Sequence, residues 1–148
     1  WPTLVSGGWD RLELGAHRFN HLGTFDESRM AGLLAAVEFL DVLGMERVED
    51  RIRYLRSRLD EALRSIPGLS VTSPSAPDLS TGMISFFMEG VDSLALQGHL
   101  SRVASVRTRV VSEYEYGWMR LSTHVYNLPG EVDRVAGLLD DVRRNGLS

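Results

Sequence analysis

The sequence predicts an α+β fold in which helices cover one face of a small sheet. Four segments carry apolar residues at helical spacing, and short apolar runs lie between them. The order of the expected elements is α-α-β-β-α-β-β-α, which favours a sheet with its helices on one side. The chain has 148 residues, 43% of them hydrophobic, and this suits one domain with an ordinary core.

Two helices are expected in the first half of the chain. The first begins near Thr24, where Glu27 completes a capping-box pattern, and it ends at Gly44. This helix is apolar almost all round, so it should be buried on more than one face. The second covers about 46–65 and ends before the Pro-Gly pair at 67–68. Its arginine-rich face carries interleaved acids at i,i+4 spacing and is expected to be solvated.

The second half of the chain is expected to supply the sheet and two further helices. The expected elements are strands at 69–73 and 83–88, a helix at 93–103, strands at 105–111 and 118–122, and a last helix at 129–144. Pro129 suits the first position of the last helix and Glu131 its first turn. Leu128 is a poor cap, so packing is expected to hold this helix end.

Charge and composition exclude several classes of partner. The formal net charge is −4 and the pI is about 5.5, so neither a nucleic acid nor an anionic membrane surface is expected as a partner. No apolar run approaches the roughly 20 residues of a membrane span. The first residues lack the basic-then-apolar pattern of a signal segment, so we expect a cytoplasmic protein.

Cysteine and lysine are both absent from the chain. The lack of cysteine removes disulfides, thiolate metal sites and cysteine nucleophiles. All 16 basic residues are arginine. No side-chain amine is therefore available to form a Schiff base.

Three stretches carry a family pattern in order. They are Arg-Phe-Asn-His-Leu-Gly-Thr at 18–24, Val-Arg-Thr at 106–108, and Arg-Leu-Ser-Thr-His-Val-Tyr-Asn at 120–127 followed by Glu131. Together they resemble the C-terminal part of class V aminotransferases, a group that includes cysteine desulfurases, selenocysteine lyases and isopenicillin N epimerase-like enzymes. The Gly-Thr-x-Asp form at 23–26 looks closer to the epimerase-like branch.

The resemblance implies a dimeric pyridoxal-phosphate (PLP) enzyme of fold type I. Residues 24–148 would be its C-terminal domain, with a small, mostly antiparallel sheet, and residues 1–23 a connecting segment from a missing large domain. That large domain, or a partner chain in a homo- or hetero-oligomer, would carry most of the PLP site and the Schiff-base lysine. The chain alone would be inactive, and its substrate would be an amino acid.

The resemblance also implies roles for particular residues. Arg120 would bind the substrate α-carboxylate, a task that suits the planar fork of a guanidinium group. His124 could touch the substrate or pack at a strand end. Gly23 and Thr24 would contribute to the PLP phosphate site of the other subunit, because a helix N-terminus binds anions; a plain N-cap is the alternative for Thr24. Tyr126 and Asn127 are expected to act structurally.

Other candidates are disfavoured by their chemistry. His17 and His21 have the spacing of a helical metal pair, but no third ligand is evident and no metal site is expected. Ser112 stands where a desulfurase-like alignment has its cysteine, and a hydroxyl cannot replace a thiolate. The reaction type stays open among aminotransferase, epimerase and lyase chemistry. A non-catalytic dimerisation or regulatory module that keeps the fold is the alternative function.

Overall fold

The computed structural model describes residues 26–111 and 117–147 of the chain. The chain divides into two units, residues 1–39 and residues 40–148, and each is considered by itself. The expected boundary between residues 23 and 24 lies outside the described residues, as does the capping position Thr24.

Helix α2 (Glu27–Leu43) begins in the first unit and ends in the second, because the division falls between Phe39 and Leu40. The sequence predicted burial on more than one face, but within the described residues no side chain of this helix is buried. Its large exposed apolar side chains are Met30, Leu33, Leu34, Val37, Phe39 and Val42. A helix that is apolar all round needs another surface to cover it in water.

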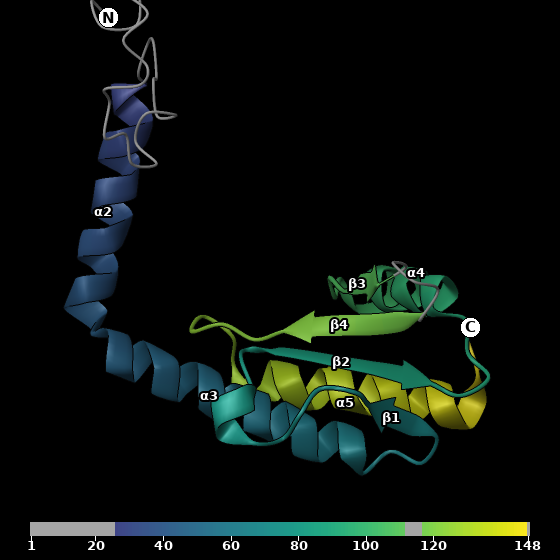
Figure 1. Cartoon of the computed structure of the whole chain (residues 1–148). Helices are drawn as coiled ribbons and strands as arrows, with labels where there is room; N and C mark the ends of the chain where they lie inside the picture. Colours follow the sequence, from purple (N-terminus) through teal and green to yellow (C-terminus); the bar gives the residue numbers. More distant parts are fainter. Residues whose placement is uncertain (1–25, 112–116, 148) are drawn as a thin grey trace, which may run out of the picture. The chain divides into compact units, whose positions relative to one another are not determined.

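The second unit contains a four-stranded antiparallel sheet, which confirms the predicted α+β class (Figure 1). The strands are β1 (Leu69–Val71), β2 (Met83–Met88), β3 (Arg109–Val111) and β4 (Trp118–Ser122), in the spatial order β1-β2-β4-β3. The bounds of β2 and β4 are those predicted.

Strands β1 and β3 are shorter than the sequence predicted, for two local reasons. The backbone N–H groups of Thr72 and Ser73 both donate to Ser85 O, which ends the regular ladder of β1. Ser105 adopts a left-handed conformation with φ of 55° and closes the preceding helix. Val106 N donates to Leu100 O in that closure, so the chain rejoins the sheet only at Arg109.

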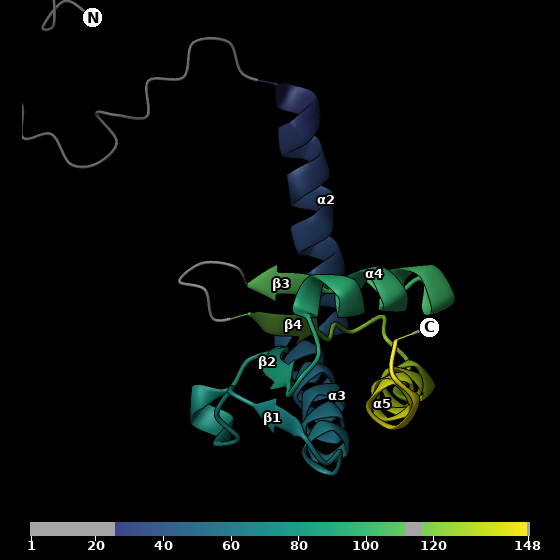
Figure 2. The same ribbon diagram turned by 90° about the vertical axis from the view of Figure 1, so that its right-hand side faces the viewer.

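Three helices cover one face of the sheet (Figure 2). They are α3 (Met45–Arg64), α4 (Ser93–Ala104) and α5 (Pro129–Asn145). In addition, a short 3-10 helix, η3 (Pro77–Leu79), lies between β1 and β2, and the sequence did not predict it. Gly44 has φ of 84° and separates α2 from α3, as predicted. None of the helices in the described ranges is long and apolar enough for a membrane span.

The core lies between these helices and the sheet. Ile84, Phe86 and Met88 of β2 alternate with side chains of the other face, and all three are buried. Met119 and Leu121 of β4 are buried in the same layer. The helices contribute the buried leucines Leu55, Leu59, Leu63, Leu96, Leu100 and Leu139. The opposite side of the sheet, called here the open face, is covered by none of α3, α4 and α5.

The arginine-rich side of α3 is not simply solvated, contrary to the sequence prediction. The expected i,i+4 pairs form, with Arg53 bound to Glu49 and Arg64 to Asp60. Arg56 and Asp60, however, are only 3% and 7% exposed. The loop between β1 and β2 covers them, and helical periodicity alone cannot reveal a covering loop.

We predict that Gly82→Ala destabilises the second unit. A Cβ at residue 82 would lie 2.7 Å from Ile52 Cγ2 and 2.9 Å from Thr123 O. Because neither neighbour is the tip of a long flexible chain, the free energy of unfolding should fall by about 1–3 kcal/mol in urea denaturation. Gly98→Ala, in α4 with no atom within 4 Å of the added Cβ, is the control. It should raise stability by about 0.5–1 kcal/mol, and a similar gain at Gly82 would contradict the close contact.

Candidate functional site

A cavity of about 360 Å³ opens on the open face of the sheet. Arg120 contributes to it from β4, directly opposite Ser85 of β2. The lining residues are Ser73, Pro74, Leu79, Ser80, Thr81, Met83, Ser85, Val111, Trp118 and Arg120. The cavity is named here the Arg120 cavity. The sequence singled out Arg120 but none of the loop residues that form the wall.

Arg120 is half-buried and has unused donor capacity. Its Nε is buried and has no hydrogen-bond partner among the described residues. Arg109 pairs in register with Arg120 from the neighbouring strand β3. A buried donor is costly to leave unsatisfied, so the Arg120 guanidinium favours a ligand that accepts a hydrogen bond. The arrangement suits a carboxylate ligand.

His124 does not join Arg120 in this cavity. It is exposed in the turn after β4, and its ring stacks on Tyr126 with centroids 4.7 Å apart. Its backbone N–H donates to Asn127 Oδ1 at 2.9 Å. The structure therefore gives His124 a place in the turn, and its contact with a substrate stays a prediction.

The remaining sequence candidates fall outside the described residues. They are Gly23, Thr24, His17, His21 and Ser112. Within residues 26–111 and 117–147, no group of three His, Cys, Asp or Glu side chains is placed to hold a metal ion.

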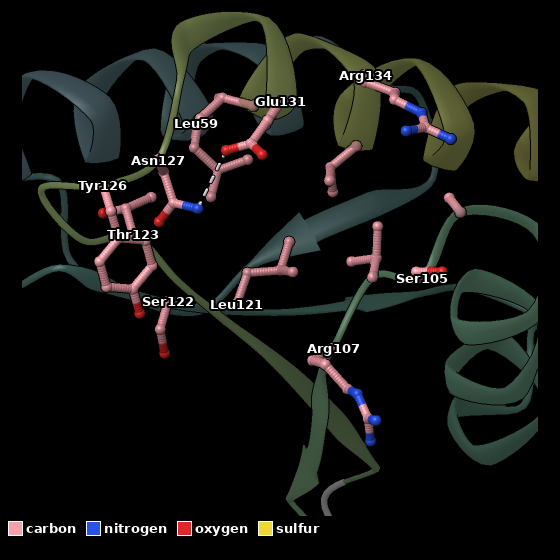
Figure 3. Close-up of a pocket in the computed structure, with 14 residues that line it drawn as sticks. Leu59, Ser105, Arg107, Leu121, Ser122, Thr123, Tyr126, Asn127, Glu131 and Arg134 are labelled. Carbon is pink, nitrogen blue, oxygen red and sulfur yellow. Dashed lines mark hydrogen bonds between the residues drawn. The ribbon is translucent and has the colours of Figure 1, made fainter.

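A second cavity, of about 420 Å³, lies on the helix side of the sheet (Figure 3). It brings the second and third family stretches together, since Arg107 and the 121–127 segment both line it. Arg107, in the segment before β3, and Arg134, on α5, both line it (Figure 3). The floor includes the apolar side chains Leu59, Val106, Leu121, Val132 and Val135.

Glu131 closes the N-terminal end of α5, where the sequence predicted packing alone. Leu128 N donates to Glu131 Oε2 at 2.9 Å, and Asn127 Nδ2 donates to the same oxygen at 3.3 Å. These bonds lower the pKa of the Glu131 carboxyl, the Leu128 N–H having the larger effect. Arg51 Nη2 donates to Asn127 O from α3. The structural role predicted for Asn127 is thus visible in its contacts.

Comparison with known sequences identifies the relatives of this chain. The sequence model of the Aminotransferase class-V family matches residues 11–135. Isopenicillin N epimerase of Amycolatopsis lactamdurans is 31% identical over 123 residues, which are 82% of this chain and 31% of that protein. A probable cysteine desulfurase 2 of Mycobacterium leprae is 32% identical over 130 residues, 79% of this chain and 30% of that protein. The chain spans about a third of the length of these relatives.

Solved structures show the same fold. A cysteine desulfurase from Thermococcus onnurineus aligns with a TM-score of 0.78 at 22% identity, covering 90% of this chain and 35% of that one. The cystine C-S lyase C-DES aligns with a TM-score of 0.71 at 22% identity, covering 82% of this chain and 31% of that one. At this level of identity the likeness concerns the fold.

We predict that Glu131 makes the stability of the second unit depend on pH. Because its pKa is lowered on folding, its contribution is present above the ordinary value of 4.5 and is lost as pH falls through the lowered value. Glu131→Gln should therefore reduce the urea midpoint at about pH 7, and the gap to the unchanged chain should close in acid. Glu61→Gln, at an exposed position of α3, controls for the loss of one negative charge. A gap that persists unchanged in acid would contradict this role.

Proposed function

Because the chain belongs to the aminotransferase class-V family of PLP-dependent enzymes, we propose that it is the C-terminal domain or subunit of such an enzyme. Its own task would be to bind the α-carboxylate of an amino-acid substrate through Arg120. The observation that carries this proposal is the buried Nε of Arg120, which has no partner among the described residues and belongs to a guanidinium in an open cavity.

The rest of the enzyme would supply the cofactor site. The chain has no lysine, so the covalent anchor of PLP must come from another domain or chain. Gly23 and Thr24 remain our candidates for a neighbouring PLP phosphate. We propose a homo- or hetero-oligomer in the cytoplasm as the working assembly. When bound, PLP supplies an electron sink for bonds at the substrate Cα.

Arg120 would orient the substrate rather than take part in bond breaking. Two N–H donors of one guanidinium plane can hold both oxygens of a carboxylate and so fix the direction of the adjacent Cα. The apolar side chains of Met83 and Trp118 line the same cavity and would exclude part of the water around that pair. A less aqueous surrounding strengthens the attraction between the two charges.

The residues favour some reactions of the family over others. The chain contains no cysteine, and a hydroxyl at Ser112 offers no thiolate to accept sulfur. We therefore favour epimerase or aminotransferase chemistry over sulfur transfer, with elimination at the substrate as a further option. The relatives include both isopenicillin N epimerases and cysteine desulfurases, so this preference rests on the missing thiol alone.

The alternative is a non-catalytic dimerisation or regulatory module. The apolar side chains of α2, none of them buried within the described residues, would suit a module that works by association. The two functions differ in what happens to PLP when the chain is joined to the rest of its protein.

We predict that bound PLP appears only in the assembled protein. The absorbance band of protein-bound PLP should be present when the whole protein, or the chain with its partner, is mixed with PLP. It should be absent for this chain alone, since there is no lysine to hold the cofactor. If neither form shows the band, the chain is a non-catalytic module.

We predict that Arg120→Ala weakens substrate binding in the assembled enzyme. Losing a charge-assisted carboxylate contact should raise KM by about 10- to 100-fold, with a smaller effect on kcat. Steady-state kinetics with the amino-acid substrate measures both. Arg144→Ala removes an exposed arginine of α5 that pairs with Asp140, and it should leave KM unchanged. Equal KM values for the two variants would remove Arg120 from the site.

A further inference from the structure

One wall of the Arg120 cavity comes from the loop between β1 and β2. Its contribution is Ser73, Pro74, Leu79, Ser80 and Thr81. Leu79, in η3, is 67% exposed although it lines the cavity. It therefore offers apolar surface to whatever occupies the space beside Arg120.

Helix α3 holds the backbone of this loop with three arginines. Arg53 Nη1 donates to Pro77 O at 2.5 Å and Arg56 Nη2 to Pro74 O at 2.5 Å. Arg64 Nη2 donates to Ser73 O at 3.1 Å. Positions 53, 56 and 64 share one side of the helix, so the three contacts follow the loop as a row.

A buried carboxylate sits in the middle of this row. Asp60 accepts from Ser75 Oγ at 2.9 Å and from Arg64 Nε at 3.0 Å, and it pairs with Arg56 at 3.6 Å. A buried ion pair adds little net stability compared with apolar residues, but breaking it leaves a buried charge without a partner. The pair therefore constrains where the loop lies more than it stabilises the fold.

The loop is also hydrogen-bonded to β2, the strand that pairs with the Arg120 strand β4. Ser85 N donates to Ser73 Oγ at 2.8 Å, and Thr72 N donates to Ser85 O at 2.8 Å. Ser85 is the residue of β2 that pairs in register with Arg120. The loop is thus tied to α3 on one side and to the neighbour of Arg120 on the other, which fixes the distance between wall and guanidinium.

We propose that Leu79 is a specificity-determining residue of the Arg120 cavity and that Asp60 is a positioning residue that acts through the loop. A ligand anchored by its carboxylate on Arg120 would place an aliphatic side chain against Leu79. Met83 and Trp118 line the same space and extend the apolar surface. The substrate class is then an amino acid with an apolar side chain. This inference rests on the proposed carboxylate role of Arg120.

The test uses the whole PLP-loaded protein and two aliphatic carboxylates without an amino group. Calorimetry measures the dissociation constants of propanoate and 4-methylpentanoate, which carry the side chains of alanine and leucine. The unchanged protein should prefer the longer acid. Leu79→Ala should reduce this preference by about tenfold or more, because each methylene contact in an apolar pocket discriminates to that extent.

Ser75→Ala tests the positioning role of Asp60 while both buried charged groups, Arg56 and Asp60, stay in the chain. It removes the hydroxyl that donates to Asp60 and should reduce the same preference. Ser75→Thr keeps a hydroxyl and should restore it, which a general loss of stability would not do. Arg58→Ala, on α3 but bonded to Asp133 of α5 instead of the loop, is the matched control and should keep the preference.

Two failures can be told apart. If Arg120→Ala leaves both dissociation constants unchanged, the proposed carboxylate site is wrong and the inference falls with it. If Arg120→Ala weakens both acids while Leu79→Ala and Ser75→Ala keep the original preference, the carboxylate site stands. In that case the loop is not its specificity wall, and the inference alone is overturned.

Discussion

The burial of Met119 and Leu121 in β4 is the constraint on which the candidate site depends. Successive side chains of a strand point to opposite faces, so Arg120 between these two core residues must face away from the helices. A slip of one residue would place the guanidinium in the core and both apolar side chains in water. Register pairs such as Ser85 with Arg120 exclude that slip. The position of the charge is therefore a consequence of hydrophobic packing.

The core on the helix side explains how the fold tolerates a buried Arg120 Nε that has no hydrogen-bond partner among the described residues. The second unit has a complete core on its helix side, formed by α3, α4, α5 and the buried side chains of the sheet. Leaving one buried donor unsatisfied costs on the order of 1–3 kcal/mol, which such a core can tolerate. Buried donors without a partner are uncommon in folded proteins, and a ligand that accepts a hydrogen bond would account for this one.

The sequence predicted those parts whose pattern is local. Strands β2 and β4 had the predicted bounds because their alternation is regular, and Arg120 was recognised through the motif at 120–127. The loop wall was missed because contacts such as Arg56 to Pro74 join residues 18 positions apart. Helical periodicity alone predicts that this side of α3 is exposed to solvent. The closure of α5 by Glu131 was missed for a different reason. Leu128, at the N-cap position, has no side-chain acceptor, and the bond is made instead by the Glu131 carboxylate, which accepts from the backbone N–H of Leu128.

The two units differ in how much of their apolar surface is buried. The Arg120 cavity lies in the second unit, which has a buried core of its own. Helix α2 carries large exposed apolar side chains, and a helix of this kind needs another surface to cover it in water. The Arg120 cavity, by contrast, is built from residues of the second unit alone, and the buried pair of Arg56 and Asp60 fixes its wall. The carboxylate site that we propose here would therefore need little reordering of the loop on binding. Preorganisation of this kind would let the proposed interaction orient the substrate instead of folding the loop.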